Sequence, residues 1–379
     1  MKVLICLSYY IPNVSGLTIY AKNLAEQLAS RGHNVTVLTS HYDKSLLETE
    51  INNKVKIIRI PMTFRISKGP MMMTFPFRCI EPVRNSDVVN CHLPSFESFF
   101  IAICSKILRK KVVVTYHSGL SWEGGGFFYK FAKIALLISE LITAVLADEI
   151  IVNTNDYAKK SRLVNVFHKK VSSIFPPIVI SKSTMELKKV IEKSLPKKKG
   201  VRIGMAGRLS TEKGLEFLLD AIPLLKKKTG DSFTIVIVGP KNPIGEEDYL
   251  KQIETKLAGY KNNITFLGAL PYEQLGSYYS ILDVLVLPSI NSTESFGMVQ
   301  VEAMLSGTPV IASNLPGVRV PIALTQMGAL VRPRSSIDLA DKILKITRNK
   351  EKYLRKRNSV EKVFSLSKTI DQYEKVLSR

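Results

Sequence analysis

Short apolar runs alternate with longer periodic segments from the start of the chain. Residues 3–7 form the first apolar run, and residues 18–30, with Leu24 and Leu28 on the apolar side, have the spacing of an amphipathic helix. Arg31-Gly32-His33 ends this helix, and residues 34–39 predict the next strand. A strand, a helix and a returning strand in this order favour a parallel sheet covered by helices.

The alternation continues along the chain and divides it into two sets. The first set has further strands at residues 55–60, 87–91 and 111–115, and a lysine-rich stretch then ends at Gly200. The second set has strands at residues 201–207, 233–238, 264–268, 281–287, 308–313 and 329–331. A chain of 379 residues is too long for one typical core. We therefore predict an α/β protein with domains over 1–180 and 201–360, a helix-containing linker over 181–200 and a C-terminal helix over 361–379.

One stretch, residues 287–304, joins the end of a strand to the start of a helix. Pro288 ends the strand, and Ser292, Thr293 and Ser295 are candidates for the helix N-cap. Free N–H groups and the helix dipole make such a terminus an anion site. With a start near Ser295, Glu294 and Glu302 would lie on the order of 10 Å apart, which suits two parts of one extended ligand. The alternative is an ordinary capped helix with solvated glutamates.

Two cations occupy a similar position earlier in the second set. Arg208 and Lys213 follow the strand over 201–207 and precede a helix that begins at Leu215. Together with the positive end of that helix they form a site that would attract phosphate groups. The alternative is a solvated charge pair.

Candidate residues of the first set also follow strands. His117 lies directly after the strand over 111–115, where ligands bind in open α/β sheets. His92 follows a neighbouring strand and is a weaker candidate for lining an acceptor cleft. Gly16 lies at the first strand–helix turn, where a glycine lets the backbone approach a phosphate or sugar. A hydrogen-bonded structural role is the alternative for both histidines.

The residues from Glu294 to Glu302 resemble a signature in which seven residues separate two glutamates. This signature belongs to retaining GT-B glycosyltransferases, the large family of glycosyl transferases group 1 and family 4 type that includes glycogen and sucrose synthases. Residues 207–214, Gly-Arg-Leu-Ser-Thr-Glu-Lys-Gly, match the diphosphate-binding motif of the family. Where the family has a Gly-Gly pair, this chain has Ser15-Gly16.

The resemblance implies a fold, a reaction and a set of roles. The fold is GT-B, with two doubly wound Rossmann-like domains facing across a cleft and a last helix that crosses back to the first domain. The reaction moves a sugar from a nucleoside-diphosphate sugar, UDP-sugar above all, to a glycan or lipid-linked acceptor with retention of configuration. No metal or other cofactor is expected.

The resemblance also assigns roles to residues of this chain. Arg208, Lys213 and the N–H groups of Phe296, Gly297, Met298 and Val299 would bind the leaving diphosphate. Glu302 would accept from the ribose hydroxyls, Glu294 from the donor sugar, and His117 would position that sugar. Gly16 and Leu270 would complete the donor site, with Leu270 in a loop that lies against the base.

Composition excludes some classes of protein. An apolar content of 45% with 23% charged residues is typical of a globular chain, and a net charge of +22 favours anionic partners. Nucleic acid is not expected, because no motif of nucleic-acid-binding proteins is present. Four cysteines without C-x-x-C spacing indicate free thiols in a reducing, cytoplasmic setting. The start of the chain does not resemble a signal peptide.

Two segments raise the question of a membrane surface. Residues 71–77 are rich in methionine and phenylalanine and are flanked by Arg65, Lys68, Arg78 and Arg84. A second segment after His117 contains Trp122, Gly124, Gly125, Gly126, Phe127 and Phe128. Such residues among cations suit peripheral contact with anionic lipid. The alternative is that residues 127–147, whose charges Lys130, Lys133 and Glu140 argue against a membrane span, form a buried helix with the methionines packed around it.

Two other functions remain open at this point. The first is a different reaction on the same fold, such as that of a sugar-nucleotide epimerase or a phosphorylase. The second is a basic, non-catalytic protein that binds membranes or nucleic acid.

Overall fold

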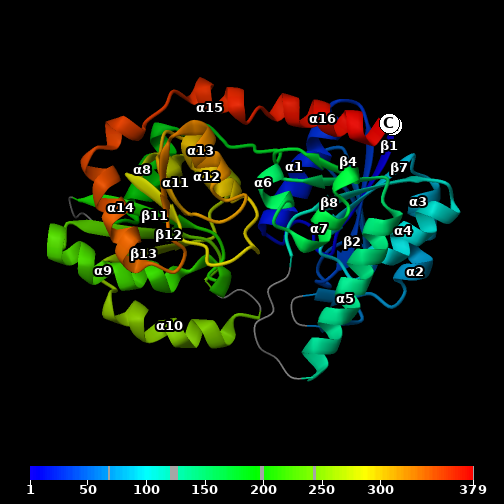
Figure 1. Ribbon diagram of the computed structural model, residues 1–379, viewed down its shortest axis with the longest axis horizontal. Coiled ribbons are helices and arrows are strands. Elements are labelled where there is room, and N and C mark those ends of the chain that lie inside the picture. Colours follow the sequence, from blue (N-terminus) through cyan, green and yellow to red (C-terminus); the bar gives the residue numbers. More distant parts are fainter. Residues whose placement is uncertain (67–68, 120–126, 197–199, 242–244, 379) are drawn as a thin grey trace. The chain divides into compact units, whose positions relative to one another are not determined.

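The computed structural model describes residues 1–66, 69–119, 127–196, 200–241 and 245–378, with the side chains of 127–129 left out. Lys68, Trp122, Gly124, Gly125 and Gly126 therefore lie outside the described residues, as do the side chains of Phe127 and Phe128. Contacts divide the chain into two units, one of Met1–Pro177 with Leu366–Arg379 and the other of Ile178–Ser365. Figure 1 shows both.

The described residues of the first unit form an eight-stranded sheet. Its order is β10-β9-β8-β7-β1-β2-β4-β3, parallel except for the antiparallel pair β3–β4. The strands are β1 Lys2–Cys6, β2 Asn34–His41, β3 Thr49–Asn52, β4 Val55–Pro61, β7 Val88–Leu93, β8 Lys111–Tyr116, β9 Glu149–Val152 and β10 Val171–Ser173. A separate hairpin joins β5 Phe64–Ile66 to β6 Gly69–Met71. The parallel core predicted from the alternating pattern is confirmed.

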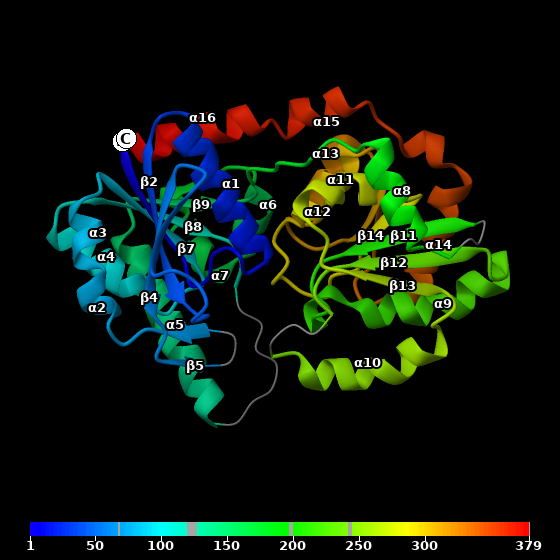
Figure 2. The ribbon, with the colours of Figure 1, turned by 180° about the vertical axis from the view of Figure 1, so that it is seen from behind.

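Helices cover both faces of this sheet. Helices α1 Gly16–Ser30 and α16 Leu366–Ser378 pack together on one face, and α16 is the last helix of the chain. The other face carries α2 Phe75–Arg78, α3 Ile80–Arg84, α4 Ser98–Ile107 and α5 Phe127–Leu146 (Figure 2). Short helices α6 Asn155–Ala158 and α7 Arg162–Val166 follow β9. Within the described part of the chain, no helix combines the length and apolarity needed to cross a membrane.

The second unit contains a six-stranded parallel sheet in the order β13-β12-β11-β14-β15-β16. Its strands are β11 Val201–Ala206, β12 Phe233–Val238, β13 Ile264–Gly268, β14 Val284–Leu287, β15 Val310–Ser313 and β16 Gly328–Val331. One face carries α9 Leu215–Thr229, α10 Glu247–Gly259 and α14 Ser336–Arg348. The remaining helices are α8 Met185–Lys193, α11 Tyr272–Ser280, α12 Met298–Leu305, α13 Val320–Thr325 and α15 Arg357–Val363.

Helix α1 and strand β14 begin at other residues than predicted, and local contacts explain both differences. Helix α1 begins at Gly16 rather than residue 18, because Ser15 and Thr18 form a capping box. The strand predicted at 281–287 begins only at Val284. Ile281 is still the C-cap of α11, and the Asp283 carboxylate accepts a hydrogen bond from the N–H of Arg202 at 2.8 Å.

Candidate functional site

The strand order of the second unit places two loops side by side. Strand β11 has β12 on one side and β14 on the other, so the chain direction across the sheet reverses between β11 and β14. In open α/β sheets, ligands bind at the carboxyl ends of the strands at such a switch point. The loop after β11 carries Arg208 and Lys213, and the loop after β14 carries Glu294.

These two loops are in direct contact. The N–H of Ile290 donates to the carbonyl of Glu212 at 3.1 Å. Gly214 has a φ of +66°, and a Cβ there would lie 2.3 Å from the carbonyl oxygen of Pro288. A side chain at this position would force the loops apart, so glycine is required for the approach.

The approach joins a lysine and a glutamate that are 81 residues apart in sequence. Lys213 Nζ donates to Glu294 Oε2 at 2.5 Å, and both side chains are largely buried. Arg208 pairs with Glu212 at 3.1 Å and keeps about a third of its side chain exposed. The structure therefore brings together three of the predicted site residues, Arg208, Lys213 and Glu294.

Helix α12 begins later than the sequence predicted. Its first residue is Met298, and its N-cap is Gly297 with a φ of +76°. Ser292, Thr293 and Ser295 are therefore not N-caps, and no side chain caps the helix. A Cβ at residue 297 would lie 2.4 Å from Leu287 Cδ2, so the turn packs against the end of β14. The N–H groups at Met298 and Val299 thus belong to the first turn of the helix, and Phe296 is buried just before it.

Glu302 lies in different surroundings from Glu294. It is the fifth residue of α12, only about one turn from the start, and the separation estimated from a start near Ser295 does not apply. Its carboxylate is buried and accepts a hydrogen bond from the Tyr279 hydroxyl at 2.7 Å. Burial raises the pKa of Glu302 to about 7. Leu270 is half-buried and follows β13 at the same edge of the sheet.

The other predicted residues, Gly16 and His117, belong to the first unit. Gly16 is the first residue of α1, and apart from its chain neighbours and the backbone of its own helix no described atom lies within 4 Å of where its Cβ would be. His117 follows β8 and is buried, with its Nε2 2.9 Å from Nδ1 of His92. Burial lowers the pKa of His117 to about 3, and burial with the neighbouring His117 holds the pKa of His92 well below its usual range. Both rings are therefore neutral at pH 7, and one donates to the other.

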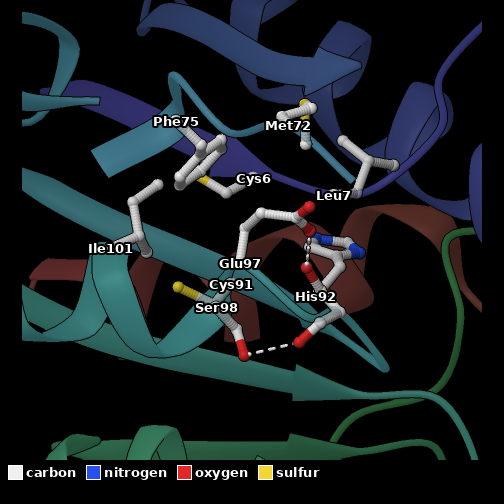
Figure 3. A pocket seen from close by; sticks show the side chains of 10 residues that line it. Cys6, Leu7, Met72, Phe75, Cys91, His92, Glu97, Ser98 and Ile101 are labelled. Atoms are coloured by element: carbon white, nitrogen blue, oxygen red, sulfur yellow. Dashed lines mark hydrogen bonds between the residues drawn. The ribbon is translucent and has the colours of Figure 1, made fainter. Parts of the chain in front are cut away.

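A small cavity adjoins His92 (Figure 3). Its wall includes His92, Ser95 and Glu97, and its space is of the order of one water molecule. Neither His92 Nε2 nor Glu97 Oε1 has a hydrogen-bond partner among the described residues, and burial raises the pKa of Glu97 to about 7.

Tyr20 packs against both histidines and is itself paired with Tyr373. The ring of Tyr20 meets His117 edge-on at 4.7 Å between centroids, and it lies 5.9 Å from His92. The Tyr20 hydroxyl is 2.5 Å from that of Tyr373 on α16. The last helix thus helps to fix the His117 ring. Sequence reasoning did not predict this network, because Tyr20 and Tyr373 show no spacing signal and Glu97 resembles an ordinary loop residue.

Metal ligands do not gather in the described part of the chain. No group of three or more histidine, cysteine, aspartate or glutamate side chains there could hold an ion.

Comparison with known families covers both units. Residues 14–182 match the family model described as Glycosyltransferase Family 4, and residues 188–363 match that of Glycosyl transferases group 1. The chain is built from two glycosyltransferase domains. The prediction of glycosyl transferases group 1 and family 4 type is therefore confirmed for the two domains.

Individual relatives agree with this assignment. An uncharacterized glycosyltransferase of Methanocaldococcus jannaschii is 28% identical over 356 residues, which is 90% of this chain and 87% of that protein. D-inositol 3-phosphate glycosyltransferase of Corynebacterium glutamicum is 33% identical over 155 residues, but the match spans only 40% of this chain and 36% of that enzyme.

Solved structures confirm the fold. Anabaena HepE in complex with UDP-glucose has a TM-score of 0.79 at 21% identity, with 100% of this chain and 99% of that chain covered. Sucrose-phosphate synthase from Thermosynechococcus elongatus has a TM-score of 0.78 at 22% identity, covering 99% and 98%. The predicted GT-B fold with Rossmann-like parallel-sheet domains is therefore confirmed.

Proposed function

We propose that this glycosyltransferase uses a nucleoside-diphosphate sugar, UDP-sugar above all, and transfers the sugar with retention of anomeric configuration. The observation that carries the proposal is the contact between Lys213 and Glu294 at the switch point of the second sheet, with Arg208 beside it. Such an edge combines cations with the start of helix α12, and both attract a diphosphate. UDP and UDP-glucose occupy structures of HepE, which has the same fold.

The diphosphate has three partners in this account. Lys213 and Arg208 stabilise the charge that grows on the leaving phosphate as the sugar bond breaks. The third partner is the start of α12. The N–H groups at Phe296, Gly297, Met298 and Val299 and the positive end of the helix dipole attract the diphosphate there. Because Lys213 pairs with Glu294, the donor meets a lysine that is already oriented.

The two glutamates hold different parts of the donor. Tyr279 occupies one oxygen of Glu302, and the other oxygen accepts from the ribose hydroxyls. Glu294 accepts from hydroxyls of the donor sugar, next to the phosphate held by Lys213. Leu270 packs against the base.

In the first domain, Gly16 and His117 are the proposed sugar-binding residues. His117 positions the transferred sugar through Nδ1, because His92 occupies its Nε2. The bare backbone at Gly16 leaves space for the donor. The acceptor is a glycan or a lipid-linked molecule. No metal is required, because the cations and the helix terminus neutralise the diphosphate.

A donor screen tests this function. The protein is incubated with UDP-, GDP- and ADP-sugars and excess EDTA, and release of free nucleoside diphosphate is measured together with the sugar product. Slow release of UDP and a free sugar of unchanged anomeric form are expected. Epimerised nucleotide sugar as the product, or no turnover and no binding of any donor, would contradict the proposal.

A further inference from the structure

Helix α5 is apolar on two opposite sides. One side is buried within the first unit at residues such as Ala132, Leu136 and Ala144. The other side carries large apolar side chains at a spacing of three or four residues, each about half exposed or more: Phe131, Ile134, Leu137, Ile138, Leu141 and Val145. A helix that is apolar all round is normally buried on all sides. Here one of its sides has no cover among the described residues.

The neighbouring helix α4 extends this surface. Hydroxyl contacts from Ser98 to Ser139 and Thr143 hold α4 and α5 side by side. Two isoleucines, Ile103 and Ile107, point out of α4, and Ile107 is 75% exposed. We name these exposed side chains of α4 and α5 the outer face. Scattered exposed apolar residues are normal on a protein surface, but a row of large apolar side chains along one side of a helix is typical of an interaction site.

The exposed charges on α4 and α5 themselves are positive, and just beyond α5 the Asp148 carboxylate pairs with Lys106. Helices α4 and α5 contain the lysines Lys106, Lys130 and Lys133, and their one acidic residue, Glu140, is buried. Two copies of a chain with a net charge of +22 would repel each other if they met through this face. An anionic bilayer offers both an apolar layer for the side chains and negative headgroups for the lysines.

We propose that the outer face of α4 and α5 docks on the surface of an anionic lipid bilayer, with α5 lying in the headgroup layer. The proposal goes beyond sugar transfer and does not depend on it. Docking would hold the first domain at a surface that displays lipid-linked acceptors.

The outer face consists of other residues than those that the sequence indicated for membrane contact. Met72 and Phe75 of the segment over 71–77 are buried, while Met73 and Phe77 are exposed. The expectation that the helix over 127–147 is buried is wrong for one of its sides. Changes at Met72 or Phe75 would therefore disturb the core of the first unit rather than test docking.

Vesicle flotation tests the proposal with variants that leave the core intact. The full chain is mixed at low salt with vesicles of phosphatidylcholine alone or with added phosphatidylglycerol. We expect binding to the anionic vesicles only, falling steeply as salt is raised. The variant Phe131→Ser/Ile134→Ser/Ile138→Ser should bind at least about tenfold more weakly, because it removes three apolar anchors. Each of Lys130→Gln and Lys133→Gln should weaken binding about fivefold.

A matched variant distinguishes docking through the outer face from attraction of vesicles by the net charge of the chain. Met185→Ser/Val190→Ser/Ile337→Ser alters three comparably exposed apolar residues of the second unit and should leave vesicle binding unchanged. Equal binding by the two triple variants would overturn the proposal, since net charge alone would then explain attachment. A protein that ignores anionic vesicles at low salt would also overturn it. A dimer in solution that dissociates in the Phe131→Ser/Ile134→Ser/Ile138→Ser variant would overturn it too, because the outer face would then be an interface between copies.

Discussion

Glu302 and Glu294 lie eight positions apart in sequence but have different chemical environments. Glu294 is ion-paired with Lys213, whereas Glu302 is buried and its neighbour is the neutral hydroxyl of Tyr279. Their spacing in sequence indicated two carboxylates at one site. The partners could not be predicted, because Lys213 and Tyr279 reach them through the order of the strands rather than through local sequence.

Substitution of each of the two glutamates by glutamine should separate the residue that binds the nucleotide from the residue that supports turnover. Glu302→Gln replaces an acceptor of ribose hydroxyls by a weaker one, so the Kd for UDP should rise. Glu294→Gln leaves the nucleotide contacts in place and should mainly lower kcat or change the preferred sugar. Titration calorimetry with UDP and steady-state kinetics measure the two effects. An identical loss of UDP affinity in both variants would contradict this division of roles.

Binding of the donor should depend on pH through Glu302. Burial raises its pKa to about 7, and ribose hydroxyls donate best to the ionised form, so donor binding should lower this pKa. The affinity for UDP-sugar should therefore fall as the pH drops from 8 to 6. Glu302→Gln has no such proton and should show a flatter profile over this range. A wild-type affinity that does not change over this range would contradict the assignment.

At the scale of elements, α12 and α5 show where sequence patterns fail. The serines and threonine before α12 are good N-cap residues, but the turn packs against β14 and only Gly297 fits its positive φ. Helix α5 was predicted at nearly its observed bounds. Its burial could not be predicted, because both sides are apolar and the pattern lacks a polar face.

The acid on α5 should make the first unit less stable at high pH. Glu140 is 2% exposed, its Oε1 has no partner among the described residues, and burial raises its pKa from 4.5 to about 8. The folded state holds this proton more tightly than the unfolded state. Its contribution to stability is therefore full below pH 4.5 and is lost as the pH rises to 8, by up to about 1.4 kcal/mol per pH unit.

Denaturant unfolding at pH 5 and pH 8.5 measures this effect. Glu140→Gln should reduce the loss of unfolding free energy between the two pH values. Glu186→Gln, which removes an exposed glutamate from α8, serves as the control and should leave that loss unchanged. A loss of the same size in Glu140→Gln as in the wild type would show that Glu140 does not cause it.

At the scale of the molecule, the alternation of apolar runs and periodic segments was enough to predict two parallel-sheet domains. Buried parallel strands such as β12 and β13 have continuous apolar sequences and were predicted at their observed bounds. The resemblance implied that the last helix crosses back to the first domain, but individual side-chain contacts between distant segments were not predicted. The pairs His92–His117 and Tyr20–Tyr373 exist because neighbouring strands and the last helix bring the residues together.

Turnover of a double variant tests whether Arg208 and Lys213 bind the leaving diphosphate. Arg208→Ala/Lys213→Ala removes both cations from the switch point, and kcat for donor turnover should fall by about 10²-fold or more. The control is Arg202→Ala/Lys226→Ala, which removes one arginine and one lysine that also form ion pairs in the second unit. Its kcat should stay close to that of the wild type. A folded Arg208/Lys213 double variant with near-normal kcat would contradict the claim that these residues bind the leaving diphosphate.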